Sequence, residues 1–261
     1  MASRIRHVFI TGGSRGIGLA IAQAFAKQNF RCTLVSRSKE NLESAVSSLT
    51  PADSAAPHRY ISGSITSSEF WSTTNFKEHG LAKGEGSSKI DVLVNCAGIT
   101  QSRLFITTPA EDIQDVVDTN LTALMLGTRF LLRNKYLSST TKSRAEAGSQ
   151  YTPSIINVSS LLGVSGGHGA VAYAASKAGV MGFTRALAAE YVQHGVRVNA
   201  IVPGYVESDM TKDLNTSQLQ DRIPLKRFGQ PEEIAHAALF LAENQYAHNC
   251  VLNLDGGLSA V

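Results

Sequence analysis

Short runs of apolar and β-branched residues recur along the chain, and each run but the last precedes a longer stretch with helical spacing of its apolar positions. The seven runs are HVFIT (7–11), RCTLV (31–35), HRYIS (58–62), DVLVN (91–95), SIINV (154–158), VRVNAIV (196–202) and VLNLD (251–255). Strict alternation of strand and helix predicts a parallel sheet with helices on both faces. We therefore predict one α/β domain over residues 1–261, with a doubly wound sheet.

Two helices have marked features of their own. Thr108 precedes Pro109 and Glu111, which predicts a helix with Thr108 as N-cap, proline in the first helical position and glutamate placed for a capping box. The stretch from Val171 to Val192 is apolar or small nearly all round. We expect it to be a helix that covers the sheet with one face and meets a partner helix of a homo-oligomer with another, a buried helix of a monomer being the alternative.

The composition is that of an ordinary globular protein, with 43% hydrophobic and 17% charged residues and a formal net charge of +3. No apolar run approaches the roughly 20 residues that span a bilayer. No block of Arg and Lys alternates with aromatic residues, so we expect neither a membrane span nor nucleic-acid binding. The three cysteines form no CxxC pair and the seven histidines have no ligand spacing, so we predict neither a disulfide framework nor a metal site.

The first 39 residues contain no Asp or Glu but several Arg and Lys. Such a start is compatible with a transit peptide, but the first strand is expected to begin at about residues 5–7, which leaves no room for a removable presequence. We interpret the asymmetry as a basic ligand pocket.

A glycine cluster, TGGSRGIG (11–18), follows the first predicted strand and opens a helix. In a parallel sheet, ligands bind beyond the carboxyl ends of the strands, so this is where a phosphate would lie. Gly12 allows the turn, Gly16 allows the backbone to approach a pyrophosphate, and Gly18 allows the helix to pack on the strand. The cluster therefore predicts dinucleotide binding, although its G-x-x-x-G-x-G spacing differs from G-x-G-x-x-G.

The second strand ends in LVSRSKENL, with Arg37 where NAD-binding proteins usually carry Asp or Glu. An additional phosphate on the ribose would be attracted by Arg15 and Arg37 together, through charge-assisted hydrogen bonds. We therefore predict NADPH as the cofactor. The alternative is that Arg37 is a solvated surface residue.

The stretch YAASK places Tyr173 and Lys177 four residues apart in a predicted helix, hence on one face. We expect the ammonium group to lower the phenol pKa, so that Tyr173 becomes a usable acid. Ser160 follows the strand SIINV, so its hydroxyl is expected at the edge of the sheet formed by the carboxyl ends of the strands. A carbonyl oxygen held between Ser160 and Tyr173 would meet preorganised donors during reduction by a nicotinamide.

Six motifs together resemble the short-chain dehydrogenase/reductase family across nearly the whole chain: TGGSRGIG, NCAG (95–98), Asn120, Ser160, YAASK and the Pro203-Gly204 pair. The resemblance implies a Rossmann-like fold. It also implies Tyr173 as acid/base, Lys177 as a ligand of the nicotinamide ribose, Ser160 as the group that orients the carbonyl, and Asn120 as support for a water relay.

The resemblance also extends to the positions expected to contact the cofactor. They are Gly12, Ser14, Arg15, Gly16, Ile17, Gly18, Arg37, Ser64, Ile65, Asn95, Ala97, Gly98, Tyr173, Lys177, Pro203, Gly204, Val206 and Ser208. Three positions depart from the common family pattern. Ser64 stands where many relatives have Asp or Asn, Ala170 where a glutamine is common, and His248-Asn249 where Thr-Gly is usual.

Within the family, PGYVESDMT (203–211), IPLKRFGQPEEIA (223–235) and LDGG (254–257) resemble β-ketoacyl-acyl-carrier-protein reductases, and NCAGITQSRLF (95–105) resembles their fungal mitochondrial members. This resemblance implies reduction of 3-oxoacyl thioesters in fatty-acid synthesis. It also implies a homo-oligomer, either tetramer or dimer, in the mitochondrial matrix, with the cytoplasm as the alternative location.

An acidic acyl carrier protein would dock on basic residues near the site. The candidates are Arg133, Lys135, Lys142, Arg144 and His194. Two alternatives stay open: a broad-specificity NADPH carbonyl reductase acting on quinones, steroids or xenobiotic ketones, and a non-catalytic nucleotide-binding subunit of a hetero-oligomer.

Overall fold

The computed structural model describes residues 5–51, 56–81, 89–101, 103–137, 151–212, 214 and 216–260. Its strands are β1 (His7–Thr11), β2 (Arg31–Ser36), β3 (Arg59–Ser62), β4 (Val92–Asn95), β5 (Ser154–Val158), β6 (Arg197–Pro203) and β7 (Val251–Leu254). They form a seven-stranded sheet in the order β3-β2-β1-β4-β5-β6-β7, and every pairing between neighbours is parallel. The predicted doubly wound parallel sheet is confirmed.

The sheet separates two hydrophobic clusters because successive side chains of a strand point to opposite faces. In β1, Val8 and Ile10 belong to the cluster that includes residues of α1 (Gly16–Lys27) and α10 (Pro231–Glu243). Phe9 lies between them in sequence and belongs to the opposite cluster. Each strand in the centre of the sheet is therefore apolar on both faces, which explains why the runs read as continuous rather than alternating.

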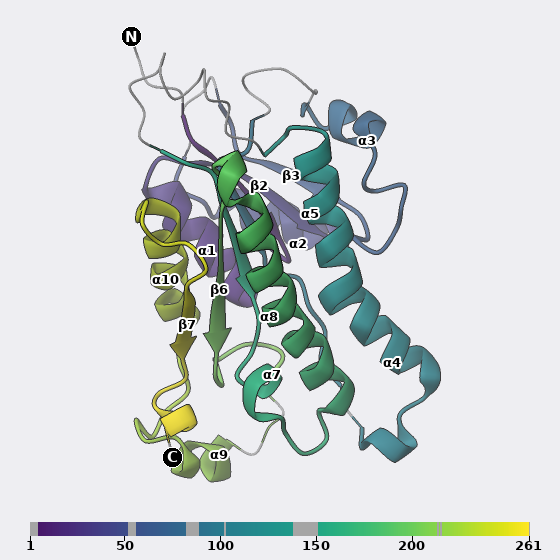
Figure 1. Ribbon diagram of the computed structural model, residues 1–261, viewed down its shortest axis with the longest axis vertical. Helices are drawn as coiled ribbons and strands as arrows, with labels where there is room; N and C mark the ends of the chain where they lie inside the picture. Colours follow the sequence, from purple (N-terminus) through teal and green to yellow (C-terminus); the bar gives the residue numbers. More distant parts are fainter. Residues whose placement is uncertain are drawn as a thin grey trace.

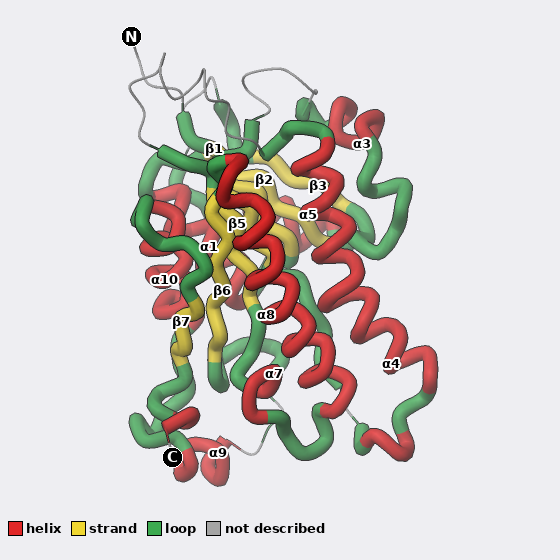
Figure 2. The backbone as a smooth tube through the Cα atoms, viewed as in Figure 1, coloured by secondary structure: helices red, strands yellow, loops and turns green. Residues whose placement is uncertain are grey.

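Helices cover the sheet on both faces (Figure 1), and the strands form the middle layer (Figure 2). Besides α1 and α10, the helices are α2 (Lys39–Ser47), α3 (Thr73–Glu78), α4 (Ala110–Val117), α5 (Ala123–Arg133), α7 (Leu162–Ser165), α8 (Val171–Tyr191) and α9 (Thr216–Arg222). A π-helical turn, η3 (Asp118–Thr122), joins α4 to α5. In the described part of the chain, no helix is both long enough and apolar enough to cross a membrane.

The predicted cap at Thr108 is wrong. The helix begins at Ala110 with Pro109 as its N-cap residue, and no side chain caps it. The Thr108 hydroxyl instead donates to the carbonyl of Leu104, the residue just before the 3₁₀ turn η2 (Phe105–Thr107) that precedes the helix. A competing local hydrogen bond of this kind is the usual reason why a threonine in a good capping context does not cap.

The order of the strands reverses between β1 and β4, and the backbones that follow these two strands approach each other closely. Gly12 has a φ of +70°, and a Cβ atom there would lie 2.8 Å from the backbone nitrogen of Ala97 at the end of β4. The Thr11 hydroxyl accepts hydrogen bonds from the backbone N–H groups of Cys96 and Ala97, at 3.2 and 3.3 Å. The carboxyl ends of β1 and β4 are thus in direct contact.

Gly18 makes the second close approach, in the first turn of α1. A Cβ atom on Gly18 would collide with the carbonyl group of Gly12. The predicted turn at Gly12 and the predicted helix-to-strand packing at Gly18 therefore both have a direct steric basis in the structure.

We expect Gly18→Ala to lower the free energy of unfolding by about 1–3 kcal/mol, because the new methyl group must displace backbone rather than a side chain. Gly182→Ala is the matched control: it is also a helical glycine, but its Cβ would meet nothing within 4 Å. The control should be neutral or more stable by up to about 1 kcal/mol, through helix propensity. Urea denaturation of both variants tests this, and equal midpoints would contradict it.

Candidate active site

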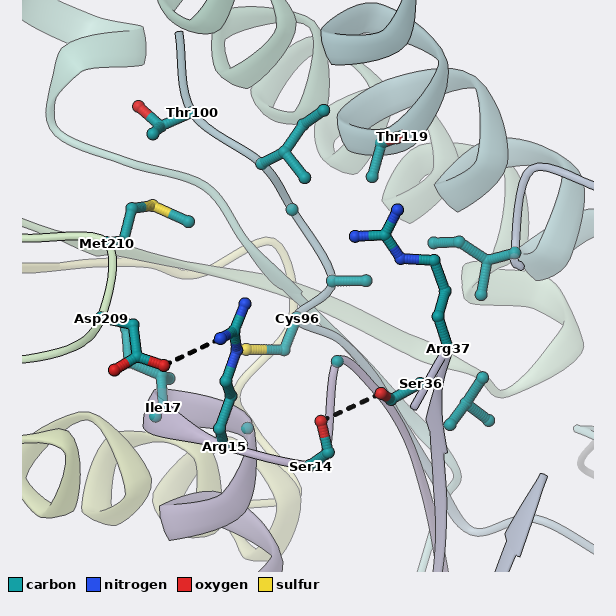
Figure 3. Close-up of a pocket in the computed structure, with 18 of the residues that line it drawn as sticks. Ser14, Arg15, Ile17, Ser36, Arg37, Cys96, Thr100, Thr119, Asp209 and Met210 are labelled. Carbon is teal, nitrogen blue, oxygen red and sulfur yellow. Dashed lines mark hydrogen bonds and ion pairs between the residues drawn. The ribbon is translucent and has the colours of Figure 1, made fainter. Parts of the chain in front are cut away.

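A cavity of about 710 Å³ lies beyond the carboxyl ends of the strands, between the glycine loop and the segments that follow β2, β3, β4 and β6 (Figure 3). Its volume is within the range of about 300–1,000 Å³ that is typical of small-molecule sites. Twelve of the predicted cofactor residues line it: Gly12, Ser14, Arg15, Gly16, Ile17, Gly18, Arg37, Ser64, Ile65, Ala97, Gly98 and Ser208.

Helix α1 begins at Gly16, in the wall of this cavity, and its N-terminal N–H groups suit a phosphate. Its N-cap residue, Arg15, makes no side-chain capping hydrogen bond, and the first turn contains no acidic residue. Gly16 has a φ of +54°, and the nearest atom to a Cβ there is the Ser208 Cβ at 3.8 Å. Unsatisfied N–H groups, a positive helix end and open space together fit the pyrophosphate of a dinucleotide.

The two arginines of the predicted phosphate site have different environments. Nη1 of Arg15 donates to Asp209 at 2.8 Å, forming an exposed ion pair across the cavity, whereas Arg37 projects from the end of β2 on the other side (Figure 3). Among the described residues, the Arg37 guanidinium forms no ion pair. Arg37 is thus the more available cation.

The charged side chains around the cavity are balanced. The cations are Arg15, Arg37 and Lys212, and the carboxylates are Asp115, Asp118 and Asp209. Of the other basic residues in the acid-free start of the chain, Arg31 is buried and Arg6 stacks on Phe30. Arg15 and Arg37 are therefore the basic residues of this start that line the cavity, and carboxylates lie near them, so the pocket is less basic than predicted.

Ser64 and Ile65 lie at the end of the cavity near β3. The Ser64 hydroxyl bonds the Thr66 hydroxyl at 2.8 Å, and the carbonyl of Ile65 accepts from the Trp71 indole at 2.7 Å. These bonds fix the segment after β3, so that its side chains form a wall of the cavity.

Six predicted cofactor residues do not line the cavity: Asn95, Tyr173, Lys177, Pro203, Gly204 and Val206. The Asn95 amide is directed into the protein, where it donates to Thr128 and to Asn157. Val206 is buried in the hydrophobic core. Pro203 ends β6, and its carbonyl accepts from the N–H of Leu161. Asn95, Val206 and Pro203 therefore support the segments around the cavity through contacts with the protein interior.

The predicted reactive residues lie together next to this cavity. Tyr173 and Lys177 share one face of α8, with the Lys177 Nζ atom 5.9 Å from the centre of the Tyr173 ring. The Ser160 hydroxyl, two residues beyond the end of β5, lies close enough to the Tyr173 phenol to affect its pKa. A Cβ on Gly98, in the cavity wall, would lie 3.4 Å from the Lys177 Nζ atom, so the group adjoins the cavity through Gly98.

The predicted lowering of the Tyr173 pKa is wrong. Burial raises the pKa of the Tyr173 phenol above its usual value and outweighs the effect of the nearby Ser160 hydroxyl, which lowers it. Tyr173 is therefore held in its protonated form, which is the form that donates a proton.

Burial has the opposite effect on Lys177, because its charged form is the protonated one. Desolvation lowers the pKa of Lys177 to about 8, and its Nζ atom donates to the carbonyl of Val158 at 2.9 Å. The Cys96 thiol nearby has a pKa raised to about 11 by burial. Near neutral pH, Lys177 can thus hold or release a proton with little change in pH.

Asn120 is completely buried in the π-helical turn η3. Its Oδ1 atom accepts from the N–H of Ile99 at 2.8 Å, and its Nδ2 atom donates to the carbonyl of Ile99 and to the Ser176 hydroxyl, both at 3.0 Å. The Ser176 hydroxyl in turn donates to the carbonyl of Tyr173. Asn120 therefore connects the segment after β4 to the helix that carries Tyr173.

Several site residues were not identified in the sequence. Thr11 holds the ends of β1 and β4 together, and Asp209 pairs with Arg15. The available signal was that Thr11 ends a predicted strand and that Asp209 lies in the segment that follows another. The pairing of Asp209 with Arg15, 194 residues away in sequence, has no local signature.

The departure at His248-Asn249 has a physical explanation. Asn249 has a φ of +56°, in the left-handed region that asparagine tolerates better than most residues. His248 accepts from the N–H of Val198 through Nδ1, and its Nε2 atom lies 3.1 Å from the carbonyl of Ala188. The pair thus performs a structural role between β6 and α8.

The predicted docking residues do not surround the site. Arg133 and Lys135 lie next to Tyr136, whose carbonyl accepts from the N–H of Ile90, just before β4. His194 likewise lies just before β6. These three are therefore at the amino ends of the strands, opposite the cavity, and the prediction that they flank its entrance is wrong. Lys142 and Arg144 lie outside the described residues.

Comparisons with a family model, with curated proteins and with solved structures all find dehydrogenases or reductases. A family model described as short chain dehydrogenase matches residues 6–219. The chain is 38% identical to a human 3-oxoacyl-[acyl-carrier-protein] reductase, over 97% of each chain. It is 36% identical to carbonyl reductase family member 4 of Xenopus laevis, over 98% of each. A crystal structure of a proposed gluconate dehydrogenase from Agrobacterium tumefaciens superposes with a TM-score of 0.80 at 28% identity, covering 98% of this chain and 96% of that one.

We expect Lys177→Met to raise the free energy of unfolding at pH 7, because it removes a buried amine whose pKa falls from 10.5 to about 8. The penalty on the charged form, less the lost hydrogen bond to Val158, gives a gain on the order of 1–2 kcal/mol. Between pH 8 and 10.5 only the unfolded wild type binds this proton, so wild-type stability rises with pH and the advantage of the variant shrinks.

Urea denaturation at pH 7 and pH 10 measures this effect. Lys27→Met is the control, since Lys27 is exposed at the end of α1 and its replacement should change stability by less than about 0.5 kcal/mol at either pH. A Lys177→Met protein that is no more stable than wild type at pH 7 would show that burial does not penalise the ammonium group.

Proposed function

The chain belongs to the short-chain dehydrogenase/reductase family, an assignment that makes it an oxidoreductase acting on carbonyl or hydroxyl groups, and on this premise we propose that it reduces 3-oxoacyl thioesters to 3-hydroxyacyl thioesters with NADPH. The observation that carries the proposal is the proximity of the Ser160 and Tyr173 hydroxyls beside the cavity that the glycine loop lines. Relatives named 3-oxoacyl-[acyl-carrier-protein] reductase, one human and one from Chlamydia muridarum at 36% identity, support the choice of substrate.

In the proposed mechanism, Ser160 and Tyr173 both donate hydrogen bonds to the carbonyl oxygen of the substrate. When bound, the nicotinamide supplies a hydride to the carbonyl carbon. The Tyr173 phenol gives its proton to the oxygen as negative charge develops there, so the products are the alcohol and a phenolate. The raised pKa of Tyr173 suits this role, because the phenol is fully protonated before the reaction and gives up its proton readily to an alkoxide, which is the stronger base.

Lys177 acts next, by returning a proton to the phenolate. Its pKa of about 8 is well below that of the phenol, so proton transfer from the ammonium group to the phenolate is favourable. Nearby, Asn120 holds the backbone of Ile99 and the Ser176 hydroxyl, and it thereby sets the position of α8 relative to the cavity wall. The family resemblance implies other roles beside these, with Lys177 as a ligand of the nicotinamide ribose and Asn120 as support for a water relay.

The choice of NADPH over NADH rests on Arg37. Its guanidinium lines the cavity and has no carboxylate partner among the described residues, so it is available to a ribose phosphate. Arg15 must first separate from Asp209 to contribute. The carboxylates Asp115 and Asp118, which also line the cavity, make this selectivity depend on Arg37 rather than on the overall charge of the pocket.

A second candidate function is a carbonyl reductase with a broad range of ketones. The similarity to carbonyl reductase family member 4 from Xenopus laevis favours it. The third alternative, a non-catalytic nucleotide-binding subunit, is disfavoured because Ser160, Tyr173 and Lys177 are all present and adjacent.

The assembly and location of the protein remain predictions within this proposal. The exposed face of α8 carries the small side chains of Ala175, Ala178 and Ala186, which leave room for close approach of a second helix. This supports a homo-oligomer, either dimer or tetramer. An acyl carrier protein as substrate carrier and the mitochondrial matrix as location follow from the resemblance to fungal mitochondrial reductases.

Steady-state kinetics with acetoacetyl carrier protein, acetoacetyl-CoA and a quinone, each with NADPH, test the proposed substrate. We expect kcat/KM for the thioesters to exceed that for the quinone by at least tenfold. Comparable rates on the quinone with none on either thioester would select the broad carbonyl reductase instead. Absence of reduction with all three, together with intact NADPH binding, would favour the non-catalytic subunit.

Replacement of the proposed acid should separate chemistry from binding. Tyr173→Phe should reduce kcat at least 100-fold, since general acid catalysis contributes about 10²–10⁴-fold, while the Kd of NADPH changes little. Tyr246→Phe is the control, because Tyr246 is 98% exposed. A Tyr173→Phe enzyme with wild-type kcat would reject the assigned role.

We expect Arg37→Ala to raise the Kd of NADPH about 10–100-fold and to leave the Kd of NADH within threefold, because a charge-assisted hydrogen bond contributes about 1.5–3 kcal/mol. Arg15→Ala is the comparison: it also removes one arginine, but one already paired with Asp209, so its effect on NADPH should be smaller. Fluorescence titration of both cofactors measures these constants. Wild type that binds NADH as tightly as NADPH would refute the charge argument.

A further inference from the structure

The helix that carries Tyr173 begins without a cap of its own. Its N-cap residue, Ala170, has no side chain that can accept a hydrogen bond, and the first turn contains no acidic residue. Tyr173 is the third residue of this helix, so its position depends on how well that first turn is held. The first N–H groups of a helix need partners from elsewhere in the structure.

Gln101 supplies such a partner from a distant segment. Its Oε1 atom accepts from the backbone N–H of Ala172 at 2.8 Å, across 71 positions in sequence. Its Nε2 atom donates to the carbonyl of Arg103 at 2.7 Å and to the Thr108 hydroxyl at 3.3 Å. Because the amide nitrogen is engaged with acceptors, the amide oxygen must face the helix. The orientation of the Gln101 side chain is therefore determined at both ends.

Two side-chain amides tie the segment after β4 to α8, one on each side of Tyr173. Gln101 reaches Ala172, and Asn120 joins the backbone of Ile99 to Ser176. Residues 172 and 176 are one helical turn apart and enclose Tyr173 between them. Ile99, two residues before Gln101, lines the cavity. The two ties therefore set the position of the catalytic phenol relative to the wall against which the cofactor lies.

We propose that Gln101 is a positioning residue for Tyr173. From outside the helix, Gln101 holds the first turn of α8 against the cavity wall. The proposal rests on the proposed function for its kinetic consequence. A displacement of about 1 Å in a reacting group can cost 10²-fold in rate, so loss of this bond should reduce kcat more than it affects cofactor binding.

The experiment compares Gln101→Met with Gln101→Glu. Methionine has a similar length but cannot accept the Ala172 N–H, whereas glutamate retains an acceptor oxygen and loses the two bonds from Nε2. We expect Gln101→Met to lower kcat at least tenfold with the KM for NADPH within twofold. Gln101→Glu should recover kcat to within threefold of wild type, because a carboxylate is favourable at a helix N-terminus.

Gln245→Met is the matched control. The Oε1 atom of Gln245 accepts from the backbone N–H of Thr152 at 2.7 Å, an equivalent bond at the amino end of β5, away from the cavity. This variant should keep kcat within twofold even where it loses stability. The proposal is overturned if Gln101→Met keeps kcat within twofold of wild type, if Gln245→Met loses as much kcat, or if Gln101→Glu falls as far as Gln101→Met.

Amide hydrogen exchange provides a readout that does not depend on the substrate. The Ala172 N–H should exchange at least tenfold faster in Gln101→Met than in wild type and Gln101→Glu, with exchange in β5 unchanged. If the wild type reduces none of the test ketones, the proposed function fails while this measurement still tests the bond. Unchanged exchange at Ala172 in Gln101→Met would overturn the positioning role itself.

Discussion

The steric contact between the ends of β1 and β4 determines where this protein can bind a ligand. No side chain fits at Gly12, because the backbone of Ala97 occupies that space, and none fits at Gly18, because the carbonyl of Gly12 occupies it. These contacts bring the N-terminus of α1 to the point where strand order reverses, with its N–H groups open to the cavity. The position of the cavity and the charge it favours both follow from this packing.

Burial sets the chemistry of the reactive group at the other end of the site. The same low-polarity surroundings raise the pKa of Tyr173 and lower that of Lys177, because one is charged when deprotonated and the other when protonated. The Lys177 pKa therefore falls below that of Tyr173: the phenol keeps its proton, and the lysine gives its proton up more easily. In the proposed mechanism, these two shifts make Tyr173 the proton donor and Lys177 the group that returns a proton to it.

Side-chain amides connect these two ends. Asn120 and Gln101 attach the segment after β4 to α8, and Asn95 joins β4 to β5 through Asn157 behind them. Gln101 and Asn120 each both donate and accept, so they satisfy backbone groups that the sheet and the helices leave unpaired at the site. The π-helical turn at Asn120 fits this pattern, since it places a completely buried amide where a regular helix would continue.

The sequence by itself determined the layered sheet, the glycine loop and the placement of Tyr173 and Lys177 on one helix face, because apolar periodicity, glycine stereochemistry and one helical turn are local properties. Only the tertiary structure decided the burial that raises the Tyr173 pKa, the pairing of Arg15 with Asp209, the role of Gln101 and the true position of Arg133 opposite the cavity. Each of these depends on groups far apart in sequence, whose distance is set by how the elements pack.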